Sequence, residues 1–253
     1  MFLKEYFKQI NAPQGNGERS AHESYNPSVP PIEQYVNKVF NGDCTQVMRH
    51  FPAQSVDLVV TDPPYLVNFQ GRTGRSYRND DPNNPWWVAP SFTEMYRVLK
   101  PNSFCVSFIG AFNAEIFLTA WKAVGFRPVG FFPFLKEYPS SQGYIKWHSE
   151  HAYLLTKGNP RANEILPNVL PFYYSGNEAH PSEKPPETLK PLIRVFSKES
   201  NIVLDSFCNS GSTLVAARDL KRRYIGIELD RNHAQTAADR AYERTAQTYS
   251  ERL

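Results

Sequence analysis

The segment TDPPY at residues 61–65 follows the apolar run VDLVV, which is typical of a strand buried on both faces of a parallel sheet. Its two prolines lack a backbone N–H, so they end the strand and leave nearby carbonyl groups without ladder partners. We therefore expect the carboxylate of Asp62 and the carbonyl oxygen of Pro63 to form two adjacent acceptors, with Pro64 and the flat ring of Tyr65 beside them. Such a set suits a planar group that bears an NH₂. The alternative is an ordinary strand-ending turn with Tyr65 in the core.

Acidic residues end three further predicted strands, at Asp43, Asp205 and Glu228. Ligands of open parallel sheets bind beyond the carboxyl ends of the strands. Together with Asp62, these acids predict a binding site along one edge of the sheet.

The stretch LDSFCNSGSTLVAA at residues 204–217 reads as a strand, a tight turn and a helix that begins at Ser212 or Thr213. The free amides and positive dipole end of such a helix suit a carboxylate or a phosphate. The stretch matches neither GxGxxG nor a Walker A loop, and a capped Gly/Ser turn is the plain alternative. Glu228, at the end of the next strand, can accept both hydroxyls of a ribose. Loop and acid together favour a ligand that contains a nucleoside.

The segment HPSEKPPE at residues 180–187 places His180 and Lys184 just before a helix that starts with prolines. These residues read either as a solvated loop or as a lysine and amides directed at a ligand carboxylate.

Apolar and amphipathic segments alternate along the chain, which predicts a Rossmann-like, mostly parallel sheet of roughly seven strands with helices on both faces. Residues 126–137 and 150–158 lack an intervening helix and predict an antiparallel pair. A helix is expected over residues 89–100, stopped by Pro101. We expect an irregular arm at residues 1–34, one domain at 35–253, and loops at about 66–85 and 158–180.

Charge and cysteine content narrow the class of protein. The chain has 28 basic and 25 acidic residues, so only a local basic patch would bind nucleic acid. Three dispersed cysteines predict neither a disulfide framework nor a metal site, and they favour the cytoplasm. No apolar stretch approaches the length of a signal peptide core or a membrane span.

The sequence resembles the amino-group DNA methyltransferases that use S-adenosylmethionine, and within them the permuted β-type arrangement in which the DPPY segment precedes the cofactor loop. The matching blocks cover most of the chain: FNGDC at 40–44, VDLVVTDPPY at 56–65, MYRVLKPNS at 95–103, HPSEKPPETLKPLI at 180–193, VLDSFCNSGSTLVAA at 203–217 and YIGIELD at 224–230. The family's fold is a seven-stranded Rossmann-like sheet with one reversed strand, which agrees with the pattern of segments.

The resemblance implies roles for the residues of these blocks. Asp205 and Phe207 would hold the methionine and adenosine parts of the cofactor, with Asp62 close by. Glu228, next to Leu229, would take the ribose hydroxyls. Asp43 and Cys44 would lie at the adenine edge of the cofactor. The turn formed by Asn209, Ser210, Gly211, Ser212 and Thr213 would face the cofactor carboxylate. His180 and Lys184 would lie near that carboxylate.

Three positions depart from the family pattern. Ser206 stands where a proline is usual, Asn209 where a glycine is usual, and Glu183 where a glutamine is usual. Asparagine tolerates the left-handed backbone conformation best after glycine, so we expect the turn at Asn209 to be kept.

The reaction implied is methylation of an exocyclic amine on a base flipped out of double-stranded DNA. Tyr65 would stack on the base, and Arg72, Arg75 and Arg78 would contact phosphates. In the resembling enzymes an aspartate in this tetrapeptide goes mostly with adenine N6 and a serine with cytosine N4, so Asp62 favours adenine. The resemblance also suggests a homodimer, and it leaves open whether a restriction endonuclease accompanies the enzyme.

Several alternatives stay open on the sequence alone. The acceptor could be cytosine N4, an RNA base or a protein amide, because a related NPPY segment serves the last two. The departures at Ser206 and Asn209 would suit a non-catalytic nucleic-acid-binding module. An NAD-dependent dehydrogenase could use the acidic strand ends, but it has no evident use for DPPY.

Overall fold

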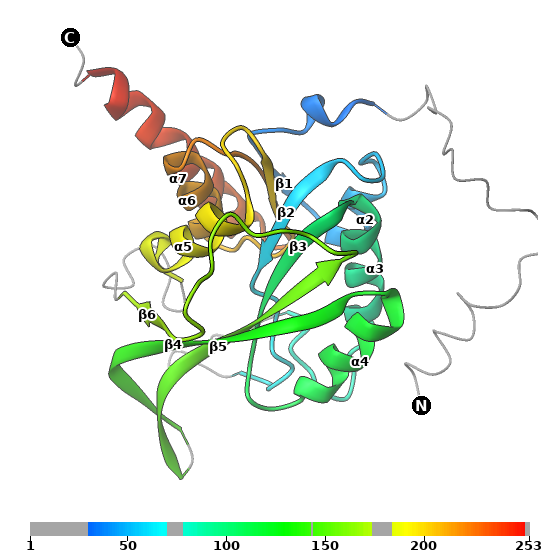
Figure 1. The fold of residues 1–253 in the computed structure, drawn as a ribbon, viewed down its shortest axis with the longest axis vertical. Coiled ribbons are helices and arrows are strands. Elements are labelled where there is room, and N and C mark those ends of the chain that lie inside the picture. The colour runs from blue at the N-terminus through cyan, green and yellow to red at the C-terminus, as the bar shows by residue number, and fades with distance from the viewer. Residues whose placement is uncertain (1–29, 70–77, 143, 174–183, 251–253) are drawn as a thin grey trace, which may run out of the picture.

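The computed structural model describes residues 30–69, 78–142, 144–173 and 184–250 of the 253-residue chain. They form one eight-stranded sheet in the order β1-β8-β7-β2-β3-β5-β4-β6 (Figure 1). Strand β5 runs antiparallel to both of its neighbours, and the other pairs are parallel. The strands are β1 Lys38–Asn41, β2 Val56–Thr61, β3 Leu99–Ile109, β4 Arg127–Gln142, β5 Ile145–Lys157, β6 Leu170–Phe172, β7 Ile202–Asp205 and β8 Arg223–Glu228. The predicted mixed α/β class with one reversed strand is confirmed.

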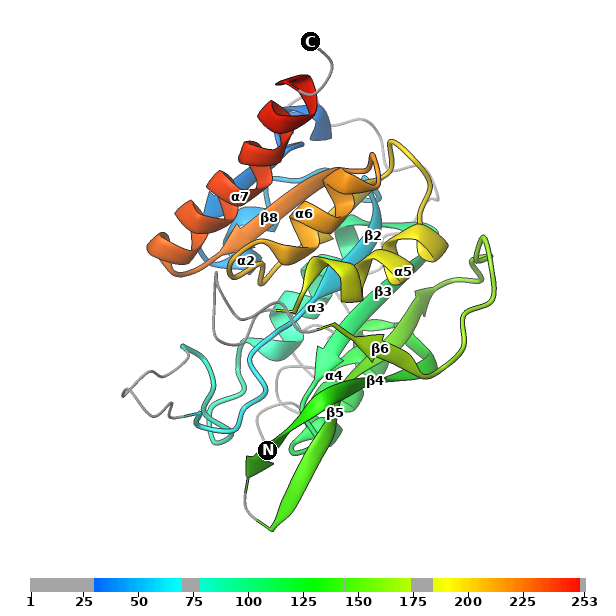
Figure 2. The same cartoon turned by 90° about the vertical axis from the view of Figure 1, so that its left-hand side faces the viewer.

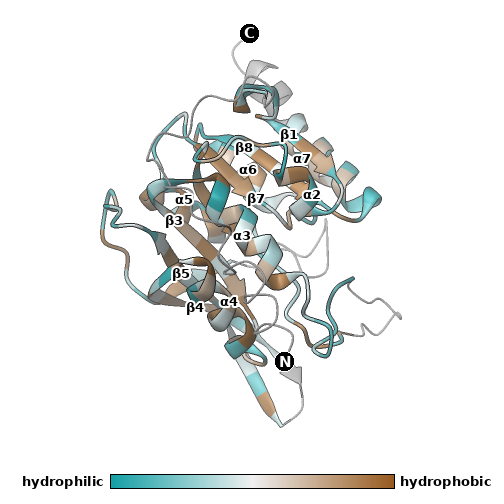
Figure 3. Ribbon diagram, turned by 90° about the vertical axis from the view of Figure 1, so that its right-hand side faces the viewer, coloured by the Kyte–Doolittle hydropathy of each residue, from teal (hydrophilic) through white to brown (hydrophobic). Residues whose placement is uncertain are grey.

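Helices cover both faces of the sheet, as Figures 1 and 3 show. One face carries α2 (Cys44–Met48), α3 (Val88–Val98) and α4 (Ala114–Val124). The other carries α5 (Pro186–Phe196), α6 (Ser212–Asp219) and α7 (Arg231–Ser250), and a short 3₁₀ turn η1 (Ile32–Gln34) precedes β1. Each face has its own core.

Strand β2 shows why its sequence is apolar without a break. Val59 packs into the core under α2, α3 and α4, whereas Leu58 and Val60 pack into the core under α5, α6 and α7. Successive side chains of a strand point to opposite faces, and both faces are covered here. The strand ends at Thr61, where DPPY begins. Its buried central position places Asp62 at the middle of the carboxyl edge.

Two expectations from the sequence were wrong: one about where a helix ends, the other about a stretch expected to lack regular structure. The helix ends two residues earlier than expected: α3 ends at Val98 rather than Lys100, and Pro101 lies inside β3. Residues that precede a proline favour extended backbone, so the chain turns into the strand before Pro101 is reached. The stretch 158–180, expected to be irregular, contains the short strand β6, which brings the sheet to eight strands.

The antiparallel pair is confirmed but is longer than predicted. Strands β4 and β5 form a hairpin that projects well beyond the body of the domain (Figure 2). A shift in register between Leu135 and Ser140 bends its outer part. The hairpin therefore reaches past the sheet edge and supplies a wall to the site described below.

The boundary of the predicted N-terminal arm stays a prediction, because residues 1–29 lie outside the described part of the chain. Across the helices that the structure does describe, none combines the length and the apolar character that crossing a lipid bilayer requires.

Candidate active site

A cleft of about 1210 Å³ opens at the carboxyl edge of the parallel strands. Asp43, Asp62 and Glu228 line it from the ends of β1, β2 and β8, and the β4–β5 hairpin forms its opposite wall. Asp205 lines a smaller adjoining cavity under the β7–α6 turn. The predicted convergence of acidic strand ends on one edge is therefore what the fold produces.

The other predicted site residues that the structure describes also gather at these two cavities. The main cleft takes Cys44, Pro63, Pro64, Tyr65, Arg78 and Leu229. Lys184, Phe207 and Asn209 line both cavities, and the smaller one adds Ser210, Ser212 and Thr213 around Gly211, which caps α6. His180, Arg72 and Arg75 lie outside the described residues.

The carboxylate of Asp62 in the DPPY segment accepts a hydrogen bond on each of its two oxygens. The Tyr65 hydroxyl donates to Asp62 Oδ1 at 2.6 Å, and the Lys184 ammonium donates to Asp62 Oδ2 at 2.6 Å. Among the described residues, none donates a hydrogen bond to the carbonyl oxygen of Pro63. A carboxylate oxygen has more than one lone pair, so Asp62 can still accept from a ligand amine. Asp62 and Pro63 both line the cleft, so the carboxylate and the carbonyl are both candidates to accept from a ligand amine.

The backbone after Tyr65 is held by a residue that sequence reasoning missed. Asp80 is buried, and its carboxylate accepts from Val67 N at 3.0 Å and from Phe69 N at 2.7 Å. Leu66, directly before Val67, adopts φ 60°, a conformation that a leucine keeps only when its surroundings enforce it. Asp80 therefore fixes the start of the loop that follows the DPPY segment. In the sequence it was one acid of a polar stretch, with no periodicity to single it out.

The ring of Tyr65 packs directly on the backbone of Gly110, just after β3. A Cβ atom on Gly110 would lie 3.0 Å from both Cβ and Cδ2 of Tyr65. A contact this short is repulsive, so any larger residue at position 110 must displace the tyrosine.

We predict that Gly110→Ala lowers the turnover number of the methyl transfer implied by the resemblance about tenfold while the protein stays folded. The added methyl group shifts the Tyr65 ring, and small displacements of positioning groups cost large factors in rate. Initial rates at saturating substrates and a thermal melt measure the two effects. Gly130→Ala is the matched control, because its added Cβ would lie 3.2 Å from Cβ of Leu154, a similarly close contact outside the cleft. An unchanged rate in Gly110→Ala would contradict this role for the glycine.

The turn between β7 and α6 keeps the geometry expected for a cofactor loop. Asn209 has φ 46°, which confirms that asparagine takes the left-handed conformation here, and Gly211 has φ 85°. The Glu228 carboxylate accepts from Asn209 N and from Asp230 N, both at 2.9 Å. These bonds orient the carboxylate and leave it further acceptor capacity toward the cleft.

The same turn carries features that fit the cofactor implied by the resemblance. Ser212 Oγ is buried, and no described residue bonds to it. It lies in the first turn of α6, whose amides have no intrahelical acceptors. Phe207 packs edge-on against Trp87 with ring centroids 5.3 Å apart, which leaves part of the Phe207 ring at the cleft. Anion donors, an aromatic wall and the Glu228 carboxylate match the carboxylate, adenine and ribose of S-adenosylmethionine.

Burial raises the pKa of two groups at the site, the carboxyl of Asp205 and the thiol of Cys44. Burial raises the pKa of Asp205 to about 7, although hydrogen bonds from Thr213, Phe207 N and Thr61 oppose the shift. Burial likewise raises the pKa of Cys44 to about 12, so this thiol stays protonated and is no nucleophile. Cys44 belongs to the wall of the cleft.

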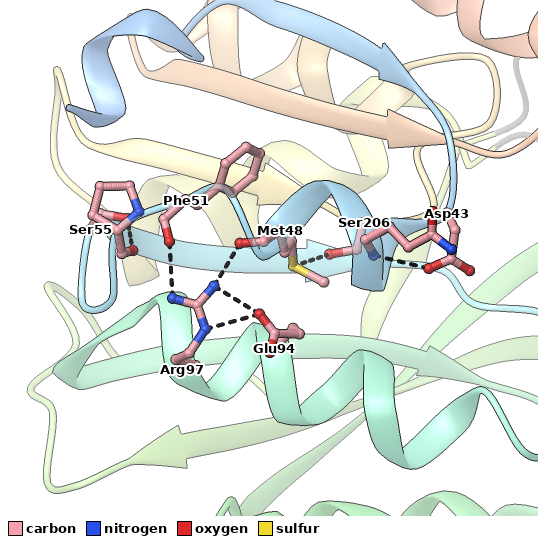
Figure 4. Close-up of polar contacts among 9 residues, drawn as sticks. Asp43, Met48, Phe51, Ser55, Glu94, Arg97 and Ser206 are labelled. Atoms are coloured by element: carbon pink, nitrogen blue, oxygen red, sulfur yellow. Dashed lines mark hydrogen bonds and ion pairs between the residues drawn. The ribbon is translucent and has the colours of Figure 1, made fainter. Parts of the chain in front are cut away.

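Helix α2 holds Asp43 at the cleft and is itself anchored at both ends (Figure 4). Asp43 caps the helix by accepting from Gln46 N at 3.1 Å. At the other end Arg97 donates to Met48 O at 2.6 Å and to Phe51 O at 2.9 Å. Ser206, one of the departures from the family pattern, is buried beneath this helix with its hydroxyl 3.7 Å from the sulfur of Met48.

Arg78 lines the cleft on the side of Glu228 and Asp230. Hydrogen bonds from His233 N and Asn232 N lower the pKa of the Asp230 carboxyl, and the Arg78 guanidinium adds a smaller contribution in the same direction. This arginine is therefore near Asp230 at the cleft.

The fold and the site define a Rossmann-like protein of the methyltransferase class, and comparison with known proteins agrees. A DNA methylase family model matches residues 156–239. YubD of Escherichia coli (strain K12), which carries the name of a methylase, is 47% identical over 195 residues, covering 77% of this chain and 85% of YubD. The chain therefore belongs to the N6/N4 DNA methylase family.

Solved structures share this fold at low sequence identity. The complex of M1.HpyAVI with S-adenosylmethionine superposes with a TM-score of 0.64 at 20% identity, covering 81% of this chain and 98% of that one. The cytosine-N4-specific PvuII DNA methyltransferase superposes with a TM-score of 0.66 at 20% identity, covering 84% and 90%.

Proposed function

We propose that this DNA methyltransferase transfers a methyl group from S-adenosylmethionine to N6 of an adenine flipped out of duplex DNA. The observation that carries the proposal is the pair of acceptors at Asp62 and Pro63. Both line the large cleft beside Tyr65, and Asp62 also lines the small cavity under α6. The cleft has a volume of about 1210 Å³, and it is lined by the cofactor candidates Phe207 and Glu228 as well as by the two acceptors. We therefore expect cofactor and base to share this cleft, with the acceptors between them.

The chemistry follows from what these acceptors do to an amine. The lone pair of an exocyclic amine is delocalised into the base, which makes the amine a poor nucleophile. Hydrogen bonds from the NH₂ to Asp62 and to the Pro63 carbonyl return electron density to the nitrogen. They strengthen as positive charge develops there, so they stabilise the transition state more than the ground state. When bound, S-adenosylmethionine supplies a methyl group on a positively charged sulfur.

Tyr65 supports the same step from the side. Its ring faces the cleft and would stack on the flipped base, an interaction worth about 1–3 kcal/mol. Its hydroxyl holds Asp62 Oδ1, so the residue that receives the base also orients the acceptor.

The choice of adenine over cytosine rests on Asp62. The fold does not decide the matter, because a cytosine-N4-specific enzyme has the same architecture. In enzymes of this kind an aspartate in the tetrapeptide goes mostly with adenine, and that association supports N6. We propose that Arg78 contacts DNA phosphates and that the loops near 66–85 and 158–180 recognise the target sequence. The methyltransferase domain would span residues 35–253, and we propose that it forms a dimer.

Methyl transfer from labelled S-adenosylmethionine tests the proposal. Duplex DNA from cells that lack DNA methylases should take up label, whereas RNA and protein should not. Digestion to nucleosides and mass spectrometry should then find N6-methyladenine. N4-methylcytosine would overturn the base assignment, and label in RNA or protein alone would overturn the DNA substrate. Sequencing that detects methylated adenines would reveal the target site.

A further inference from the structure

The ammonium group of Lys184 lies between two carboxylates that come from distant parts of the chain. It is 2.6 Å from Asp62 Oδ2 and 3.9 Å from Glu150 Oε2. Its side chain is only 10% exposed, and it lies over the rings of Phe108 and Tyr65 at 5.1 and 5.6 Å. A lysine this enclosed has little freedom to leave its partners, because few other positions would solvate its charge.

Glu150, on β5, is in turn held by the hairpin. It forms an ion pair with Lys136 of β4, and both residues line the main cleft. Burial alone would raise the pKa of the Glu150 carboxyl, but the charges of Lys184 and Lys136 outweigh it and keep that pKa below its ordinary value. Glu150 is therefore a fixed anion beside the DPPY segment, and the charges alternate from Lys136 through Glu150 and Lys184 to Asp62.

We propose that Lys184 and Glu150 are positioning residues for the acceptor Asp62. This inference rests on the function proposed above. Glu150 anchors the ammonium group, and the ammonium group holds Oδ2 of Asp62 while the Tyr65 hydroxyl holds Oδ1. With both oxygens held, the carboxylate cannot rotate away from the direction in which the substrate amine must approach.

The charge balance strengthens the same conclusion. Without Lys184, two carboxylates in one partly buried cleft would face each other with no cation between them, and their repulsion would drive them apart. Asp62 is the more exposed of the two side chains, at 29% against 24%, and Glu150 keeps Lys136 as a partner. Asp62 would therefore be the group that moves.

Replacing Glu150 distinguishes two possible roles of Lys184: positioning Asp62, or binding the carboxylate of the cofactor. The resemblance places Lys184 near the carboxylate of the cofactor, and in that role alone its loss would weaken cofactor binding. An anionic Glu150 offers nothing to a cofactor carboxylate, so its removal should leave cofactor binding intact. If Glu150 positions Lys184 and through it Asp62, its removal should slow turnover instead.

The test compares Lys184→Met, Lys184→Arg and Glu150→Gln with the unchanged protein, using methylase-free genomic DNA and labelled cofactor. Lys100→Met is the matched control, because Lys100 forms a 2.6 Å ion pair with Asp57 near the opposite end of β2. Calorimetry with S-adenosylhomocysteine measures cofactor-site binding independently of activity, and thermal melts verify folding.

We expect the turnover number to fall about 100-fold in Lys184→Met and about tenfold in Glu150→Gln, with KM for DNA nearly unchanged. Lys184→Arg should recover part of the loss, and Lys100→Met should match the unchanged protein. Glu150→Gln should bind S-adenosylhomocysteine within about twofold of the unchanged protein. A normal turnover number in Glu150→Gln, or a loss explained entirely by weaker cofactor-site binding, would overturn the positioning role. If the unchanged protein methylates no DNA, the proposed function itself fails.

Discussion

Replacing Asp62 by alanine is expected to abolish methyl transfer to DNA, with a loss of at least about a thousandfold in turnover. Removing one preorganised polar group from a transition-state site costs about 10²–10³. Here the alanine also releases both Tyr65 and Lys184 from their shared partner. Transfer of labelled methyl groups to DNA measures the loss, and calorimetry with S-adenosylhomocysteine should show cofactor-site binding that is nearly intact.

The control for this prediction is Asp239→Ala, which removes an exposed carboxylate on α7 that accepts a hydrogen bond from Gln235 of the same helix. It should leave activity and stability unchanged. Substantial methylation by the Asp62→Ala protein would show that the amine is not activated by this carboxylate, and the mechanism would then need another acceptor. Loss of folding in the thermal melt would instead show that Asp62 serves mainly to balance Lys184.

The sequence predicted the parts of the site that depend on local chemistry. Asp62 and Glu228 each end a buried strand, and the parallel arrangement brings strand ends together whatever the distance along the chain. Asn209 is predictable for a similar reason, because its left-handed backbone follows from residue type and a tight turn.

The parts that could not be predicted depend on register between distant strands. Glu150 and Lys136 meet because β4 and β5 pair in one particular register, and β5 is the strand that runs the other way. A shift by one residue would turn Glu150 to the other face of the sheet. Lys184 reaches Asp62 because α5, which begins just after it, packs on β2 and β3. Strand β6 was missed because it is three residues long with a proline at its centre.

Asp205 shows that the cofactor loop is kept at some cost to stability. Burial raises its pKa in the folded protein to about 7, whereas an aspartate in the unfolded chain ionises near its ordinary value of about 3.9. Below that lower pH both states hold the proton, and the group does not affect stability. As pH rises toward 7 the unfolded state loses its proton first, so this group progressively favours unfolding.

We therefore expect Asp205→Asn to stabilise the protein at pH 8, by something on the order of 3 kcal/mol, and to have little effect near pH 4. Asparagine keeps an oxygen that can accept from Thr61 and Phe207 N but carries no charge to bury. Thermal melts across this pH range measure the effect.

Asp57→Asn is the matched control, because it removes a carboxylate that is paired with Lys100, and it should destabilise the protein instead. The stabilised Asp205→Asn protein should bind S-adenosylhomocysteine more weakly, since an amide is a poorer acceptor than a carboxylate at the turn that we propose receives the cofactor. A variant that is no more stable at pH 8 than the unchanged protein would show that Asp205 is ionised without penalty, held by its hydrogen bonds to Thr61, Thr213 and the backbone of Phe207.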